Sequence, residues 1–490
     1  MTEISFDEIP LNWRKPGVYT EVKPVYDDMG LAEYPARTII IGQKLASGSA
    51  APEVITAITR PEQGLALAGA GSVGAEMVDY FKRANRATEC MLILLPDAAA
   101  GIAASGTLTF TGAPAFGGPL PVYVEDERLA IAVTAGQSLA AIAIAVAAAI
   151  NAMAHLPVTA SAAEGVVTLT ARHKGEVGNG YHIAVARRQG DAVPAGLSVA
   201  VSSMSGGATN PDIDDALDAI GNEWFTDLVV PWTDATTLSK LSAWLDERYS
   251  AMARLDAHAY AGVRGNYAGL VTKGGLTNSR HLTLIGAHGS PSAPHKWAAS
   301  LAGVASHYLT NDPARQLRSL VLVGIEAPAA PDCFEEGEQN LLLGKGISTF
   351  SRLKDGRVTL DRVITAYRVS NLGVADTAWL DIMVPKTLSR IRYDWGAYAQ
   401  LQWPRHKLAN DGTAAANHAD NVATPRRVHG SWGARCDLYE RRGWIEDAET
   451  TVGKSVFARD DSDKNRLNSR KRVQIIGNLM VLAGALEFQV

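Results

Sequence analysis

Residues 69–74 (GAGSVG) match the G-x-G-x-x-G pattern of dinucleotide-binding loops. In such a site the loop directly follows a buried strand, so that its backbone N–H groups meet the pyrophosphate. Here the preceding residues 60–68 (RPEQGLALA) make a poor strand. Asp97 is at a suitable spacing along the chain for the carboxylate that binds a ribose, but a proline, Pro96, comes just before it. We interpret the segment as a glycine-rich turn in which Ser72 caps the next helix. The alternative, from another class of protein, is a nucleotide-dependent α/β enzyme that binds its nucleotide at Gly69–Gly74.

Three histidines, His281, His288 and His295, recur every seven residues across glycine- and proline-rich sequence. Metal sites favour closer pairs with cysteine or carboxylate partners, and none is present around these histidines. The chain also contains no C-x-x-C, Walker A, G-x-S-x-G or H-E-x-x-H motif, and no carboxylate pair stands out as an acid and a base. We therefore predict that the protein is not an enzyme and has no catalytic residue, metal or cofactor.

Basic residues gather toward the C-terminal end of the chain. Residues 386–472 contain 17 Lys and Arg against 11 Asp and Glu, a formal charge of +6, so the remainder carries −11 of the total of −5. Because acidic residues such as Asp460 lie close to the basic clusters, we expect a contact with a protein and not with nucleic acid. The alternative is that these basic residues form a solvent-exposed face that contacts no partner. The clusters are Arg426, Arg427, Arg441, Arg442, Arg470, Lys471 and Arg472.

The elements that position these residues are those of an α/β protein. With 490 residues, 47% of them hydrophobic and 20% charged, the chain is long enough for about three globular domains. Strand and helix patterns alternate over 31–98 and 206–385, and several strands are continuously apolar, as in a sheet covered on both faces. We expect a doubly wound, largely parallel sheet. Its predicted strands are 37–42, 90–95, 228–232, 258–263, 281–286 and 320–325.

Residues 99–205 differ in composition and are predicted to be an inserted α+β domain. Segments 106–112 and 165–170 alternate like strands, and an alanine-rich helix begins near Ser138, a suitable N-cap. The apolar run 139–150 is shorter than the ~20 residues that span a bilayer, so it is interpreted as a buried helix and no membrane insertion is expected.

The two ends of the chain are predicted to be extended arms, 1–30 and the end of an α+β C-terminal domain, 386–490. Prolines prevent one long element in the first 30 residues, but 18–23 alternate like a strand, as do the last five residues. No signal peptide is seen, and the three widely spaced cysteines fit a reducing compartment, so synthesis and assembly in the cytosol are expected.

Several short motifs occur in a definite order along nearly the whole chain. They are Pro16–Tyr19 with Glu21 (PGVYxxE), Gly71–Ser72 with Met77, Val78 and Phe81, Lys174–Asn179 (KGxxGN), Asn311–Arg315, Leu320–Ile325, Asn340–Leu343, Gly346–Thr349, Asp355–Gly356 and Val363–Tyr367. Each motif is weak alone, but together their order and spacing resemble those of contractile phage tail sheath proteins, and those of the Mu-like branch most of all. One motif departs slightly, with ITAY where the family has ITTY.

The resemblance implies a structural subunit of the virion, assembled in the host cytoplasm, that stacks helically as six-membered rings around an inner tail tube. Contraction of such a sheath drives the tube through the host envelope. The implied partners are further copies of the chain, the tube protein, and the baseplate and tail terminator proteins. The C-terminal domain would lie near the tube, and the inserted domain would lie outermost. The basic clusters above would then be the residues that contact the tube. A sheath of a phage-tail-like bacteriocin or secretion machine is the close alternative.

The terminal arms of this family join the sheets of neighbouring subunits. A strand whose N–H and C=O groups are unpaired can pair with another chain, which agrees with such a role. The residues predicted to link subunits are Val18, Tyr19, Thr20, Val22, Leu486, Phe488 and Val490.

Overall fold

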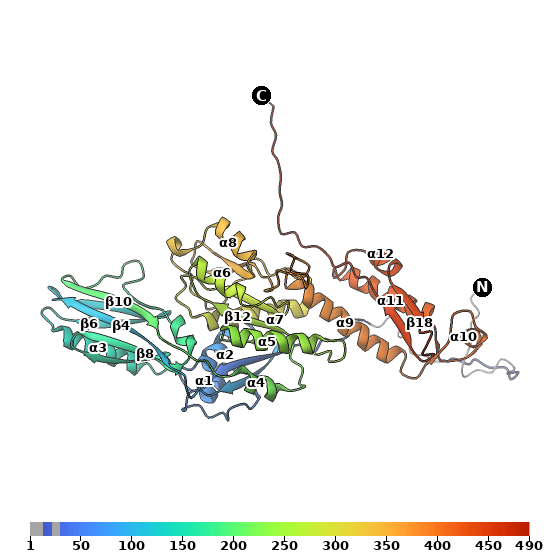
Figure 1. Ribbon diagram of the computed structural model, residues 1–490, viewed down its shortest axis with the longest axis horizontal. Helices are drawn as coiled ribbons and strands as arrows, with labels where there is room; N and C mark the ends of the chain where they lie inside the picture. Colours follow the sequence, from blue (N-terminus) through green and yellow to red (C-terminus); the bar gives the residue numbers. More distant parts are fainter. Residues whose placement is uncertain (1–12, 22–29, 490) are drawn as a thin grey trace. The chain divides into compact units, whose positions relative to one another are not determined.

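A computed structural model describes residues 13–21 and 30–489 of the chain (Figure 1). The described residues form two compact units. The core unit comprises residues 35–389 and 480–489. The C-terminal unit comprises residues 390–479 together with the described part of residues 1–34.

The core unit is built on one mixed sheet of eight strands, in the order β15-β14-β13-β12-β11-β1-β3-β2. The six inner strands run parallel, and β2 and β15 are antiparallel at the edges. This confirms a mixed α/β fold. The strands are β1 (Arg37–Gln43), β2 (Thr56–Ile58), β3 (Glu89–Leu95), β11 (Asp227–Val229), β12 (His258–Val263), β13 (Leu282–Gly286), β14 (Ile347–Arg352) and β15 (Val358–Arg362).

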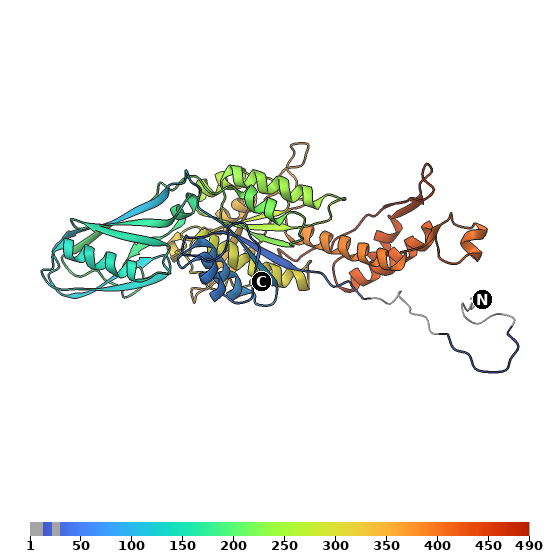
Figure 2. The ribbon, with the colours of Figure 1, turned by 90° about the horizontal axis from the view of Figure 1, so that it is seen from below.

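Helices lie on both sides of this sheet (Figure 2). α2 and α7 pack together and contact β1, β11 and β12, while α4 packs on α5, and α6 on α8. Inner strands such as β1 and β3 are almost wholly buried because both faces are covered. The helices are α1 (Glu62–Ala68), α2 (Val73–Ala84), α4 (Ile213–Ile220), α5 (Ala235–Tyr249), α6 (Tyr267–Gly275), α7 (Pro294–Asn311) and α8 (Glu336–Leu343), with a 3₁₀ turn η2 (Ala330–Asp332).

One predicted strand, residues 320–325, is wrong. This segment makes a single bridge, Val321 to Thr359, and otherwise turns. Ser319 (φ 65°) and Gly324 (φ 82°) are both in the left-handed region, so they interrupt the extended backbone that the apolar pattern suggested.

The segment between β3 and α4, residues 96–212, is called the inserted segment below. It contributes two further sheets, of order β10-β4-β8-β7 and β6-β5-β9. The Ser138 hydroxyl accepts the N–H of Ala141 at 3.3 Å, which confirms the predicted N-cap of α3. The elements are β4 (Ala103–Gly112), β5 (Gly118–Val124), β6 (Glu127–Val133), α3 (Leu139–Ala152), β7 (Val158–Ala163), β8 (Val166–Lys174), η1 (Glu176–Gly180), β9 (Ile183–Val185) and β10 (Leu197–Ser205).

The prediction of a buried helix at 139–150 is correct for only one face of α3. Ile142, Val146 and Ile150 are buried, but Ile144 is 62% exposed. A uniformly apolar sequence gives no periodicity from which the outer face could be identified. No helix within the described residues is both long and apolar enough to cross a membrane.

The C-terminal unit is mainly helical, with two small two-stranded sheets, β16-β17 and β18-β19. Its core contains Tyr398, Trp432, Cys436, Tyr439 and Trp444. α9 begins within the core unit's residues and continues into this one. The elements are α9 (Met383–Gln402), β16 (Lys407–Leu408), α10 (Ala414–His418), β17 (Val422–Ala423), α11 (Pro425–Arg441), α12 (Ala448–Gly453), β18 (Val456–Arg459) and β19 (Leu467–Arg470).

Candidate functional site

Residues 69–74 form a turn between two helices, α1 and α2, instead of the strand–loop–helix unit of a nucleotide site. The Ser72 hydroxyl accepts the N–H of Ala75 at 3.2 Å, which confirms the predicted cap. A Cβ atom on Gly71 would lie only 2.5 Å from the carbonyl oxygen of Leu156. Backbone of the inserted segment therefore packs closely against the loop at Gly71.

Ligands of doubly wound sheets bind at the carboxyl ends of the strands where the strand order reverses, here between β1 and β11. This position is filled by the buried side chain of Gln43. Gln43 donates to Asp97 and to the carbonyl of Lys174, both at 3.0 Å, and accepts the indole N–H of Trp232 at 3.2 Å. Asp97, considered above for a ribose, also lies 2.6 Å from His173. The protein's own polar groups thus close the crevice.

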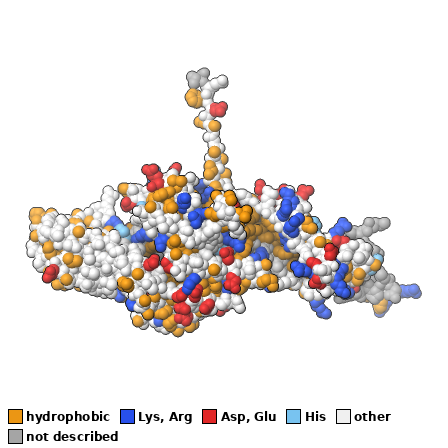
Figure 3. Space-filling view, viewed as in Figure 1, with side chains coloured by type: hydrophobic (Ala, Val, Ile, Leu, Met, Phe, Trp, Pro, Cys, Tyr) orange, Lys and Arg blue, Asp and Glu red, His pale blue; other side chains and the backbone are white. Residues whose placement is uncertain are grey.

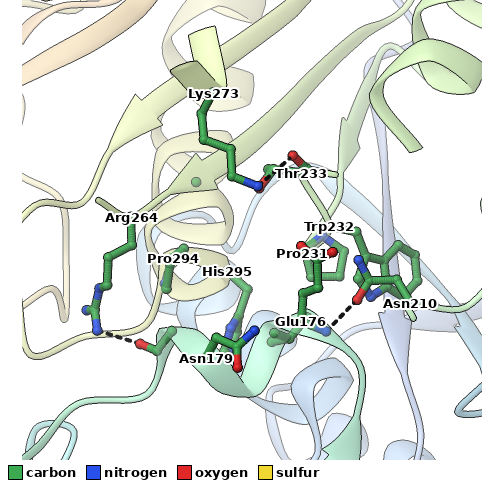
Figure 4. A pocket seen from close by; sticks show the side chains of 13 residues that line it. Glu176, Asn179, Asn210, Pro231, Trp232, Thr233, Arg264, Lys273, Pro294 and His295 are labelled. Atoms are coloured by element: carbon green, nitrogen blue, oxygen red, sulfur yellow. Dashed lines mark hydrogen bonds between the residues drawn. The ribbon is translucent and has the colours of Figure 1, made fainter. Parts of the chain in front are cut away.

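A polar cavity of about 250 Å³ remains beside this crevice, at the carboxyl ends of β11 and β12 (Figure 4). Figure 4 shows Lys273 reaching toward Thr233, to whose carbonyl it donates at 3.2 Å. Arg264 donates to the carbonyls of Gly180, Ser290 and Ser292. The two basic side chains therefore hold backbone carbonyls, and Arg264 joins the inserted segment to the core.

The three regularly spaced histidines have different surroundings. His288 lies 2.7 Å from the carbonyl of Gly265, and His295 lies 2.7 Å from Glu76. His281 is buried, which lowers its pKa to about 3. In the ranges 13–21 and 30–489, no group of three or more His, Cys, Asp or Glu side chains is arranged to hold a metal ion.

A group of five buried or partly buried residues, which we call the Lys296 cluster, holds several charged side chains close together. Lys296 Nζ, on α7, lies 2.5 Å from Glu125, 3.2 Å from Asp126 and 3.3 Å from Glu76, which itself pairs with His295. Glu125 and Asp126 form the two-residue turn between β5 and β6, and Glu76 lies on α2. The cluster therefore ties the inserted segment to two core helices through buried ion pairs, which are costly to leave unpaired.

The charges of the Lys296 cluster are not balanced, because three carboxylates surround one lysine. Burial raises the pKa of Glu125 to about 8; the charge of Lys296 opposes this shift, and those of Glu76 and Asp126 add to it. Burial also acts to raise the pKa of Glu76, but Lys296 and His295 outweigh it, so the net shift is downward. Glu125 is thus the cluster's carboxyl that holds its proton most tightly.

A second buried ion pair, which we call the Asp394 pair, lies in the C-terminal unit. Arg435 on α11 contacts Asp394 on α9 at 2.5 Å, and both are buried. Asp394 also accepts the hydroxyl of Tyr439 at 2.6 Å and the backbone N–H of Ala32 at 2.7 Å, while Arg435 donates to the carbonyl of Gly30 at 3.3 Å. Residues 30–32 are therefore anchored to α9 and α11, at the base of the predicted N-terminal arm.

The N-terminal residues predicted to link subunits are exposed where they are described. Val18 is 96% exposed, and Tyr19 and Thr20 are also at the surface. Val22 lies outside the described residues. The backbone of 13–21 belongs to no described sheet, so its pairing with another chain stays a prediction.

The C-terminal residues predicted to link subunits lie on an extended segment at the end of the core unit (Figure 1). The segment leaves the core at Met480, whose carbonyl accepts Arg318 at 3.3 Å. Beyond it, Leu486 is 97% and Phe488 is 85% exposed, while Val490 lies outside the described residues. Exposed apolar side chains on an extended segment are typical of a chain that pairs with a partner, and this role stays a prediction.

The basic clusters divide into exposed and internally bonded residues. Figure 3 shows Lys and Arg side chains on the visible face of the C-terminal unit. Lys471 packs over the rings of Trp395 and Trp432, and burial lowers its pKa. Arg427, although exposed, donates to the carbonyls of Val422 and Ala416. The other exposed members are Arg426, Arg441, Arg442, Arg470 and Arg472, and tube contact stays a prediction for all seven.

The sequence alone did not reveal the members of the Lys296 cluster or of the Asp394 pair. Lys296 and Asp394 lie in helical segments in which nothing distinguishes them from surface charges. Only the Glu125–Asp126 turn carried a usable signal, because alternating segments flank two polar residues as in a hairpin. Their partners come from distant parts of the chain, so their pairing required the fold.

Comparisons with known proteins agree on one family. A family model described as the phage tail sheath protein central domain matches residues 206–366. The chain is 30% identical over 485 residues to the Mu-like prophage FluMu tail sheath protein of Haemophilus influenzae, covering 99% of both chains.

Two solved structures match almost the full length of the chain at low identity. One is the sheath tail protein of Desulfitobacterium hafniense, with a TM-score of 0.49 and 12% identity over 94% of this chain and 100% of that one. The other is the helical sheath of the anti-feeding prophage in its contracted state, with a TM-score of 0.49 and 12% identity over 97% and 98% of the two chains. On the strength of the full-length relative, the chain belongs to the phage tail sheath protein family.

Proposed function

We propose that this chain is a structural subunit of a contractile tail sheath and catalyses no reaction. The 30% identity to a tail sheath protein over almost the full length of both chains is the observation that carries the proposal. Copies stack helically as six-membered rings around an inner tail tube, and the sheath shortens to drive the tube through the host envelope. The particle is a virion whose tail is assembled in the host cytoplasm. Baseplate, tail terminator and tube proteins are its other partners.

The terminal segments link the copies by strand addition. Residues 18–20 and 481–489 offer extended, exposed backbone. The sheet β18-β19 of the C-terminal unit has only two strands among the described residues, so both of its outer edges can accept another strand. A two-stranded sheet is marginal alone and gains stability from a third strand. A neighbour's terminal segments are therefore its natural complement, and the resulting head-to-tail contact propagates instead of closing.

Electron microscopy of the purified chain tests this function. We expect ordered, striated tubes from the full-length protein. Deletion of residues 1–25 removes the exposed segment but keeps residues 30–32, which anchor to Asp394. The deleted chain should keep its melting temperature and fail to form tubes. Ordered tubes from the deleted chain would disprove arm linkage, and failure of the full-length chain to polymerise under any condition would contradict the sheath function.

The exposed arginines of residues 386–472 face an acidic inner tube. Complementary charge of this kind guides assembly more than it adds affinity. Assembly on tubes should therefore slow as salt is raised from about 0.05 to 0.5 M, because the screening length falls from above to below ~10 Å. An assembly rate that stays constant across this range argues against the contact.

A sheath of a phage-tail-like bacteriocin or secretion machine would share this mechanism. The anti-feeding prophage sheath has a similar fold. Capsid genes beside the gene for this chain support the phage assignment, and their absence from that neighbourhood supports the alternative.

A further inference from the structure

A groove of about 740 Å³ lies in the core unit between α8 and β14. All six residues of β14 line it, so the groove follows the whole length of this strand. Val481, near the start of the C-terminal segment 480–489, lines it as well. The groove therefore meets the point at which that segment leaves the core unit. Its apolar lining comes from α6, from α8 and from the turn before α8, and includes Leu270, Phe334, Leu342 and Leu343.

Part of β14 has an open edge in this groove. In the pairing of β14 with β15, Phe350 faces Leu360. Arg352 faces Val358 in the same way. These two β15 residues hydrogen-bond on the far side of β15, to residues 320–322. Directly opposite residues of an antiparallel pair either bond to each other or both turn outward, so Phe350 and Arg352 point their N–H and C=O groups away from β15. On that side β13 pairs with only the first two residues of β14, and no further described strand lies there.

The C-terminal segment has the properties of the missing strand. It is extended, and its apolar side chains Val481 and Leu482 are 79% and 86% exposed. Residues 482–486 span roughly 16 Å when extended, which exceeds the ~7 Å from Phe350 to Arg352. An open strand edge beside apolar side chains is the usual receptor for such a segment.

The same chain is a better source of this strand than a second copy. Met480 packs against the hydrophobic core, and its carbonyl accepts Arg318, so the segment starts beside the groove. A short tether of this kind gives an effective concentration on the order of millimolar, which far exceeds the concentration of separate subunits in dilute solution.

We propose that, in the unassembled subunit, residues 482–486 fold back into this groove and pair as a strand with Phe350 and Arg352 of the same chain. The extended segment described above is then the released form. A segment that is paired with its own chain is unavailable to the β18-β19 sheet of a neighbour, because both pairings use the same backbone groups. Folding back therefore delays assembly until a growing particle offers the competing edge. This role rests on the proposed function, whereas the folding back itself does not.

The chain carries a natural probe of the groove. Cys333 is half-buried and lines the groove, while the other two cysteines, Cys90 and Cys436, are buried. In the full chain, kept dilute and monomeric, a thiol reagent should label Cys333 at least about five-fold more slowly than in a chain that lacks residues 482–490. Protection by the same chain is unchanged by dilution. Equal labelling of the two chains, or protection that disappears on dilution, overturns the inference.

A proline tests the strand pairing itself. Arg352→Pro removes the N–H that faces the groove and leaves the hydrogen bonds to β15 in place. Arg352→Ala is the matched control, because it removes the same charge and keeps the N–H. The proline variant should expose Cys333 as fully as the deletion does, and its tubes should appear after a shorter lag in light scattering than those of the alanine variant. Melting temperatures check that both variants fold, and the deleted chain keeps the inference testable if the proline variant does not.

The outcomes separate the inference from the proposed function. Equal labelling of the proline and alanine variants overturns the strand pairing, and equal lags overturn its role in assembly. If the unmodified chain and every variant fail to form tubes, the proposed function fails, while the labelling of Cys333 still decides whether the segment folds back.

Discussion

The two units each bury an ion pair, but the two sites differ in how their charges balance. The Asp394 pair joins one carboxylate to one guanidinium, and a tyrosine hydroxyl and a backbone N–H satisfy the remaining acceptor positions. The Lys296 cluster sets one ammonium among three carboxylates. A balanced pair fixes geometry at any ordinary pH, whereas an unbalanced cluster must gain a proton or another cation as conditions change.

The largest effect should come from Lys296→Met, which leaves the buried Glu125 and the partly buried Glu76 and Asp126 without their cation. We expect a loss of about 3–5 kcal/mol in the free energy of unfolding. Hydrogen exchange should quicken most in α7 and the β5–β6 turn. Urea unfolding and exchange mass spectrometry measure both effects. The control, Lys240→Met, removes a partly exposed lysine paired with Asp212 and should leave stability nearly unchanged. Equal losses in the two variants would show that burial of the lysine is unimportant.

Arg435→Met breaks the balanced pair and should cost about 3 kcal/mol, because Tyr439 and Ala32 still donate to Asp394. The expected signature is local: hydrogen exchange at residues 30–34 should rise together with exchange in α11. Arg441→Met, an exposed arginine on the same helix, is the control. Protection of 30–34 that survives the loss of Arg435 would show that the backbone bond of Ala32 is sufficient.

The stability that the Lys296 cluster contributes should depend on pH. Because burial raises the pKa of Glu125 to about 8 from 4.5, the folded state binds this proton more tightly than the unfolded state does. Its contribution is fully present below pH 4.5 and is lost as the pH rises through 8. Glu125→Gln cannot ionise, so its stability should fall less between pH 5 and 9. Melting temperatures across this range test the prediction, and parallel curves for the two proteins contradict it.

The smallest effect is expected from the helix caps. Ser72→Ala removes the cap of α2, the helix that carries Glu76, and should cost about 1 kcal/mol. Ser138→Ala removes the corresponding cap of α3, which lies apart from the cluster. A larger loss at Ser72 than at Ser138, measured by urea unfolding, would show that the start of α2 is coupled to the Lys296 cluster.

The sequence was informative where local patterns decide the structure. The apolar strands at 37–42 and 90–95, and the caps at Ser72 and Ser138, follow from burial and backbone chemistry within a few residues. The strand predicted at 320–325 failed because two left-handed residues bend an apolar run that is otherwise suitable. The Lys296 cluster could not be predicted, because Glu76, Glu125 and Lys296 are separated by long stretches of sequence and meet only after the sheet has formed.

The turn that carries Glu125 has a consequence for how relatives of this chain should vary. Glu125 has φ 55° at the first position of a two-residue hairpin turn, where glycine meets no steric penalty. Glycine here would ease the backbone and bring the cluster nearer to charge balance, because Glu76 and Asp126 still pair with Lys296. Diverged homologues with glycine at this position should therefore keep the lysine.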